Sequence, residues 1–174
     1  MDALKIKLFA DGADINEMKK LYQDNIVKGF TTNPTLMRKA GVKDYKAFSR
    51  ELLELITDLP ISFEVFSDDF EQMEREAREI HSWGFNVYIK VPVSNTEGKS
   101  TVPLIERLVG DGLKLNVTAV FTVRQVEQII CALDADVPAV VSVFAGRIAD
   151  KDMKSMFLLS HALLLLVPMI HILA

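Results

Sequence analysis

The sequence has few of the residues that build cross-linked, fibrous or disordered proteins. It contains one cysteine, eight glycines and six prolines in 174 residues. A single cysteine, Cys131, permits neither an internal disulfide nor a cysteine metal cluster, and it fits a reducing cytoplasm. Glycine and proline are too rare for collagen or a low-complexity chain. With 49% hydrophobic and 25% charged residues, the composition is that of one soluble globular domain.

An excess of positive charge is also absent. Lysine and arginine number 20 against 24 acidic residues, which gives a formal net charge of −4. The chain therefore has no general attraction for nucleic acid or for an anionic membrane. Residues 1–7 carry neither the apolar core nor the cleavage site of a secretory signal. We expect a cytoplasmic protein without a nucleic-acid partner, in which a local site holds any anionic substrate.

Charge disappears completely from the last twenty residues, 155–174, of which fifteen are apolar. A membrane-spanning helix needs about 20 such residues, so this tail is a candidate anchor. Pro168, His161 and the lack of a basic flank weaken that interpretation, and we do not expect a membrane partner. The histidines are too scattered for a metal site, and none is predicted.

Short aliphatic and β-branched runs alternate with longer stretches in which apolar residues recur every three or four positions. This alternation predicts repeated βα units. Asp68 is the predicted cap of one helix, and Thr122 with Gln125 forms the capping box of another. In this second helix Cys131 lies on the apolar side, so we expect it in the core of the protein. The six predicted strands are 4–10, 28–31, 61–65, 86–91, 114–118 and 138–143.

Strands that are joined by helices run parallel, which leaves an open doubly wound sheet or a closed barrel. Neither GxGxxG nor GxxxxGK[ST] follows any predicted strand, so the commonest nucleotide-binding open sheets are disfavoured. We therefore predict an α/β protein with a (β/α)8 TIM barrel. Six units are visible where eight are needed, so the barrel is expected to be incomplete, with its seventh and eighth units missing or degenerate.

Polar residues gather at the carboxyl ends of the predicted strands, the end at which barrel enzymes place their catalytic residues. Lys90 is the strongest candidate for a catalytic residue, because it lies inside an apolar run, Val87 to Val93. Desolvation favours a neutral amine, which can attack a carbonyl and form a Schiff base. The alternative is an edge strand from which Lys90 reaches water. The polar residues at these ends are Asp11, Thr31, Thr32, Asn33, Glu64, Lys90, Asn116, Thr118 and Ser142.

Each of the other candidates also has a plain structural interpretation. Glu64 and Asp11 border apolar strands and could move protons, but Asp-Gly is also a turn signal. Asn33 precedes a proline, which is another turn signal. Asn116 and Thr118 share one face of a strand and could be satisfied core residues. Arg147 suits a phosphate, and is otherwise a surface cation.

Six segments in this order resemble the transaldolase family. The resemblance runs from about residue 5 to residue 152, and each segment falls at a predicted strand end. The segments are Lys7-Leu-Phe-Ala-Asp11, Gly29-Phe-Thr-Thr-Asn-Pro-Thr35, Ser62-Phe-Glu-Val65, Tyr88-Ile-Lys-Val-Pro-Val93, Asn116-Val-Thr118 and Val141-Ser-Val-Phe-Ala-Gly-Arg147.

The resemblance implies a transferase of the pentose phosphate pathway that needs no metal or cofactor. It would move a dihydroxyacetone unit from a ketose phosphate to an aldose phosphate. Lys90 would form the Schiff base, Asp11 would be the acid/base, and Glu64 would shuttle protons through a water positioned by Thr118. By the same analogy we expect a homo-oligomer. The implied substrate-binding residues are Thr32, Asn33, Asn116, Ser142, Phe144 and Arg147.

The related fructose 6-phosphate aldolases also resemble this chain, and their activity is the first alternative. They typically have Gln in place of Glu64 and a Tyr near the site, where this sequence offers Phe121 and Phe144. The sequence therefore favours a transferase. A second alternative is an inactive partial barrel that acts as an interaction subunit, because the family's seventh-strand phosphate motif is not visible.

We predict one barrel domain over residues 1–154 and an atypical apolar tail, 155–174, that is not a separate domain. Four explanations of this tail stay open. We favour truncation or a shifted reading frame after about residue 154. The others are a degenerate seventh strand at Leu163 to Val167, a membrane anchor, and an apolar contact within an oligomer.

Overall fold

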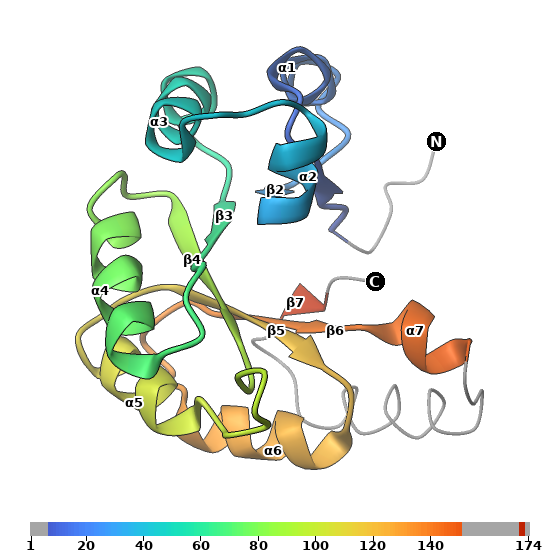
Figure 1. The fold of residues 1–174 in the computed structure, drawn as a ribbon. Coiled ribbons are helices and arrows are strands. Elements are labelled where there is room, and N and C mark those ends of the chain that lie inside the picture. Colours follow the sequence, from blue (N-terminus) through green and yellow to red (C-terminus); the bar gives the residue numbers. More distant parts are fainter. Residues whose placement is uncertain (1–6, 151–170, 173–174) are drawn as a thin grey trace.

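The computed structural model describes residues 7–150 and 171–172. Within these residues one sheet holds seven parallel strands in sequence order. Figure 1 shows the sheet curling into part of a barrel with helices around its outer side. The predicted incomplete (β/α) barrel is confirmed. The strands are β1 (Ala10–Asp11), β2 (Phe30–Thr31), β3 (Ile61–Glu64), β4 (Val87–Pro92), β5 (Leu115–Val120), β6 (Val140–Val143) and β7 (His171–Ile172).

Helices connect the first six strands, so that each strand is followed by at least one helix. Two helices, α2 and α3, separate β2 from β3. The helices are α1 (Ile15–Gln23), α2 (Pro34–Lys39), α3 (Tyr45–Leu55), α4 (Phe70–His81), α5 (Val102–Gly110), α6 (Val123–Ala132) and α7 (Ala145–Ala149). Among the described helices, none is both long and apolar enough to cross a membrane.

The seventh place in the sheet is taken by a strand of only two residues. In β7, His171 and Ile172 pair with Val140 and Val141 of β6. This agrees with a degenerate seventh strand, although the segment differs from the one that the sequence suggested. Leu163 to Val167, like most of the apolar tail, lies outside the described residues.

The strands separate apolar from polar side chains because successive residues point to opposite faces. The odd-numbered positions of β3 and β4 are apolar and fully or almost fully buried, as with Phe63 and Ile89, and they belong to the hydrophobic core. The even-numbered positions carry Glu64 and Lys90, which are register partners. One face of the sheet therefore packs with the helices, and the other carries the polar groups.

The predicted helix signals are confirmed in one case and shifted in another. Thr122 and Gln125 form the expected capping box of α6. The cap of α4 is Asp69 rather than Asp68, because Asp69 accepts a hydrogen bond from the backbone of Gln72. Asp68 instead accepts two hydrogen bonds from Thr96 of the next loop.

The prediction that Cys131 belongs to the core is wrong. Its side chain is exposed. The buried residues of α6 are Val126, Ile129 and Ala132, which follow a spacing of three. Cys131 is two positions after Ile129, and two helical residues span about 200°, so it falls on the opposite side of the helix.

Gly29, which precedes β2, is expected to tolerate no side chain. A Cβ atom there would lie 2.6 Å from Phe9 Cδ1 and 2.9 Å from Pro60 Cγ. We predict that Gly29→Ala lowers the free energy of unfolding by about 1–3 kcal/mol, the usual cost of overpacking. Gly110→Ala, at the end of α5 with open space around the new methyl group, is the control and should be neutral or stabilising. Urea denaturation measures both, and equal effects would contradict the prediction.

Candidate active site

A row of three polar side chains crosses the middle of the sheet on its inner face. In the register of β3, β4 and β5, Glu64 pairs with Lys90, and Lys90 pairs with Asn116. Directly paired residues in neighbouring strands point to the same face. These three predicted site residues therefore lie side by side.

Lys90 lies on a central strand, so the edge-strand interpretation is wrong. β4 is hydrogen-bonded to β3 on one side and to β5 on the other. The Lys90 side chain is 11% exposed, and its Nζ lies 3.6 Å from Glu64 Oε2. Nζ also donates a hydrogen bond of 3.3 Å to the backbone oxygen of Thr32. The amine is therefore held in a buried position by one carboxylate and one carbonyl.

Glu64 shares this buried environment, and its side chain is 22% exposed. Burial raises the pKa of the Glu64 carboxyl above its usual range, because desolvation disfavours the charged form. The positive charge of Lys90 opposes this rise, and the negative charge of Asp11 adds to it. The pKa of Glu64 therefore depends on its burial and on two of the other predicted catalytic residues, and a perturbed pKa in such a setting marks a candidate functional site.

Asp11 ends β1 and is held by hydrogen bonds from the next unit. Thr31 Oγ1 donates to Asp11 Oδ1 at 2.6 Å, and Asn33 Nδ2 donates to Asp11 Oδ2 at 3.5 Å. Asn33 is also the cap of α2, because its Oδ1 accepts from the backbone of Leu36. The Asn33 oxygen therefore caps a helix while its amide nitrogen faces Asp11, and its role in binding substrate stays a prediction.

Asn116 stands at the centre of a buried chain of three polar side chains. Its Nδ2 donates to Ser62 Oγ at 3.0 Å, and its Oδ1 accepts from Ser142 Oγ at 2.6 Å. The side chain is completely buried. Because one end of the amide donates and the other accepts, the two serines fix its orientation. A buried amide held in this way presents defined donor and acceptor positions to the inner face.

One residue of this arrangement, Ser62, was missed in the sequence, and another, Thr31, was named there only as a polar residue at a strand end. Ser62 contacts Asn116, and Thr31 contacts Asp11. The signal for Ser62 was its position two residues before Glu64, which puts both on one face of β3. Thr31 directly precedes Thr32, which the sequence predicted as a substrate-binding residue. In the structure the backbone oxygen of Thr32 accepts a hydrogen bond from Lys90 Nζ.

The remaining candidates lie around the ends of β5 and β6. Thr118 is 3% exposed, and its Oγ1 has no hydrogen-bond partner among the described residues. The rings of Phe121 and Phe144 meet edge to face at 5.3 Å. The Arg147 guanidinium lies 4.9 Å from the centre of the Phe144 ring. Within the described residues, no hydrogen bond or ion pair joins any of these four residues, Thr118, Phe121, Phe144 and Arg147, to Lys90.

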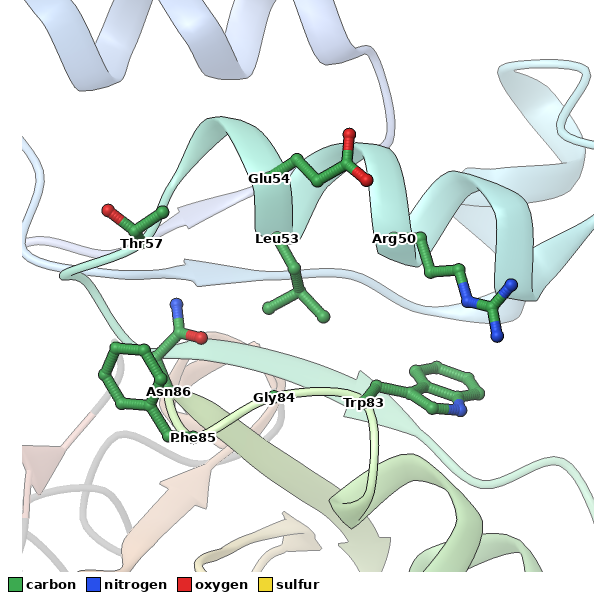
Figure 2. A pocket seen from close by; sticks show the side chains of 8 residues that line it. All are labelled: Arg50, Leu53, Glu54, Thr57, Trp83, Gly84, Phe85 and Asn86. Carbon is green, nitrogen blue, oxygen red and sulfur yellow. The ribbon is translucent and has the colours of Figure 1, made fainter.

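A cavity of about 400 Å³ lies elsewhere, between α3 and the turn that precedes β4. Figure 2 shows this cavity beneath Leu53 and beside the ring of Trp83. It opens at the amino end of β4, because Asn86 directly precedes that strand. None of the predicted catalytic or binding residues lines it. Its lining consists of Arg50, Leu53, Glu54, Thr57, Trp83, Gly84, Phe85 and Asn86.

A metal site does not emerge from the described residues either, where no group of three or more His, Cys, Asp or Glu side chains is placed to hold an ion. The reactive groups that the inner face offers are a buried amine, two carboxylates and an oriented amide. An amine flanked by a carboxylate with a raised pKa can form a carbon–nitrogen bond and pass protons.

Comparison with known proteins identifies the family of this chain. The family model described as Transaldolase/Fructose-6-phosphate aldolase matches residues 8–161. The chain belongs to this family. Among its transaldolase relatives, a probable transaldolase of Dehalococcoides mccartyi is 36% identical over 155 residues, which are 89% of this chain and 68% of the relative. A probable transaldolase of Caldicellulosiruptor saccharolyticus is 40% identical over 146 residues, 83% of this chain and 62% of the relative.

A third relative, a probable transaldolase of Methanococcus maripaludis, is 34% identical over 158 residues, 91% of this chain and 69% of the relative. The chain therefore spans about two thirds of the length of the curated transaldolases that it matches. The match includes every strand from β1 to β6 and every predicted site residue, because it extends from residue 8 to residue 161.

The coupling of Glu64 to its neighbours predicts two pKa changes of opposite sign. Lys90→Met should raise the pKa of Glu64 further, because it removes the positive charge that lowers it. Asp11→Asn should lower the pKa of Glu64, because it removes a negative charge. Titration of the Glu64 carboxyl by carbon-13 NMR measures both changes, with Lys28→Met, at an exposed lysine, as a control. Shifts of the same sign in the two variants would refute the coupling.

Proposed function

We propose that this protein transfers a dihydroxyacetone unit from a ketose phosphate to an aldose phosphate through a Schiff base on Lys90. The observation that carries the proposal is the buried Lys90 amine, 3.6 Å from the Glu64 carboxylate on the inner face of the sheet. Family membership supports the reaction class. The proposal assigns Lys90, Asp11, Glu64 and Thr118 to catalysis, and it requires no metal or cofactor.

The first half of the reaction makes and uses an imine. The Lys90 amine attacks the carbonyl carbon of the ketose, and loss of water leaves a protonated imine. Glu64 takes and returns the protons of this step through a water that Thr118 positions. Asp11 then accepts the proton of the hydroxyl next to the bond that breaks. The electron pair of that carbon–carbon bond moves into the imine, and the first aldose phosphate leaves.

The second half reverses these steps with a new partner. The enamine that remains on Lys90 attacks the aldehyde carbon of an incoming aldose phosphate, and Asp11 returns its proton to the new hydroxyl. The product leaves when water hydrolyses the imine. Asn33, Asn116 and Ser142 would hold the hydroxyls of the three-carbon unit, because they offer oriented donors and acceptors at the same face.

Arg147 would bind the phosphate of the sugar, because a guanidinium offers paired donors to phosphate oxygens. Its stacking on Phe144 supports this role by holding the cation beside β6 while its donors stay accessible. Thr32, which places its backbone oxygen on Lys90 Nζ, and Phe144 complete the proposed substrate site. We include in this proposal a cytoplasmic location, a role in the pentose phosphate pathway and assembly into a homo-oligomer.

Transfer is favoured over the free aldol cleavage of related fructose 6-phosphate aldolases. Glu64 is a carboxylate that exchanges protons with a water, whereas those relatives typically have Gln there. Phe121 and Phe144 offer no phenol hydroxyl at the aromatic position. An enamine kept away from water survives until an aldose intercepts it.

The imine gives the first test of this proposal. Incubation with fructose 6-phosphate and borohydride should add the mass of a reduced dihydroxyacetone unit, and peptide mass spectrometry should place it on Lys90. Lys90→Met should abolish the adduct, and Lys28→Met should keep it. Absence of an adduct on folded wild-type protein would overturn the Schiff base, and would favour the inactive partial barrel instead.

The raised pKa of Glu64 gives the second test. Glu64 must be ionised to accept a proton, so kcat/KM should fall as the pH drops through a pKa above the usual carboxyl range. Glu64→Gln should lower kcat by about 10²–10⁴-fold, the usual share of general acid–base catalysis, and should remove this low-pH limb. Glu97→Gln, at an exposed loop carboxylate, is the control. An unchanged pH profile in Glu64→Gln would exclude the shuttle role.

A further inference from the structure

The sheet departs from regular pairing at one place, between β5 and β6. Val117 pairs with Val141, and the next pair is Val120 with Val143. Two residues of β5, Thr118 and Ala119, therefore oppose the single Ser142 of β6. An extra residue of this kind is a β-bulge, which locally redirects the side chains of the strand that carries it.

Ala119 makes this bulge by adopting a backbone conformation that side chains disfavour. Its φ is +58°, in the left-handed region. Glycine enters this region freely and asparagine enters it more easily than most residues, whereas β-branched residues are strongly excluded from it. Conformations of this kind persist where the surrounding structure demands them, and they cluster at functional sites.

The bulge reverses the alternation of β5. Before it, Asn116 and Thr118 face the polar inner side and Val117 faces the core. In a regular strand Phe121 would lie on the core side together with Val117 and Ala119, because side chains alternate between the two faces. The extra residue of the bulge moves every later side chain to the opposite face. With the bulge, Val120 is completely buried beside Val143.

Phe121 consequently reaches the side on which Phe144 lies. The two rings meet at 5.3 Å, and the backbone N–H of Phe144 donates to the carbonyl of Val120 at 3.0 Å. β4 is not disturbed, because Thr118 still pairs with Pro92. The bulge thus brings Thr118, from before it, and Phe121, from after it, to one face of the sheet.

We propose that Ala119 is a positioning residue, whose left-handed backbone aims the Thr118 hydroxyl and the Phe121 ring together at the inner face of the sheet. Ala119 does not itself contact the reacting atoms. Its effect on catalysis rests on the transfer reaction proposed above, whereas its effect on geometry does not. The two can therefore be tested separately.

The experiment compares substitutions that differ in their tolerance of the left-handed conformation. Ala119→Gly and Ala119→Asn can keep the bulge, whereas Ala119→Val cannot, although valine and asparagine are similar in size. The first readout is the NMR contact between the rings of Phe121 and Phe144. We expect this contact in the wild type and in the Gly and Asn variants, and its loss in the Val variant. Its survival in Ala119→Val, or its loss in Ala119→Asn, would overturn the proposal.

The second readout is the rate of transfer. Ala119→Val should lower kcat by up to about 10²-fold, the effect of a displacement of about 1 Å, with a smaller change in KM, and Ala119→Asn should restore kcat. Equal kcat values for the Val and Asn variants would contradict the positioning role. If the wild-type protein transfers nothing but the ring contacts follow the expected order, the proposed function fails while the geometric proposal stands.

A third measurement covers the case in which Ala119→Val does not fold. Ala119→Gly should raise the urea midpoint of unfolding, because glycine removes the disfavoured Cβ contact of the left-handed conformation. Ala132→Gly, at a helical position in α6, should lower the midpoint, since glycine is a poor helix former. A lowered midpoint in Ala119→Gly would show that Ala119 is not held in this conformation, and would overturn the proposal.

Discussion

The two-residue alternation of side chains along parallel strands is the constraint on which the rest of this structure depends. It lets a strand such as β4 be buried in the sheet and still carry a lysine, because Ile89 and Val91 occupy one face and Lys90 the other. Since neighbouring strands are in register, the same alternation in β3 and β5 brings Glu64 and Asn116 beside Lys90. The row of Glu64, Lys90 and Asn116 thus follows from the strand register alone.

Electrostatics then decides what this polar face can do. Lys90 and Glu64 form a close pair, with 3.6 Å between Nζ and Oε2, and in a buried pair the cost of desolvation can exceed the attraction between the charges. Burial has the largest effect on the pKa of Glu64 and raises it, Lys90 lowers it, and a second carboxylate, Asp11, raises it further. The raised pKa of Glu64 means that its protonated form is favoured by folding. The contribution of Glu64 to the free energy of unfolding is therefore greatest at a pH below the pKa that Glu64 has in the unfolded chain. This contribution is lost as the pH rises through the pKa that Glu64 has in the folded protein.

The hydrogen bonds around this face explain why it keeps its shape while polar. Asp11 is held by Thr31, and the Asn116 amide is fixed at both ends by Ser62 and Ser142. A buried polar group without partners is costly, and a fully satisfied chain of them is rigid. Thr118 is one exception and Thr32 is another, since the buried hydroxyls of both have no partner among the described residues. A hydroxyl in that state is free to hold a water or a substrate oxygen.

Local patterns predicted the βα order, the approximate positions of six strands and the polar inner face, because periodicity and strand ends are properties of neighbouring residues. The strand predicted at 61–65 agrees with Ile61–Glu64, whereas the one predicted at 4–10 is reduced to Ala10–Asp11. The partnership of Ser62 with Asn116 could not be predicted, because it depends on the register between strands that are 54 residues apart in sequence.

The bulge at Ala119 could not be predicted from the sequence, because position 119 holds neither the glycine nor the asparagine that is usual in a left-handed conformation. The segment from Leu115 to Val120 has the composition of an ordinary strand, and its local preference is for regular alternation. The pairing of Val120 with Val143 overrides that preference, since it buries both side chains in the core. Places where packing overrides a local rule are expected at functional sites. The departure stands between Thr118 and Phe121, where regular alternation could not have put both side chains on one face.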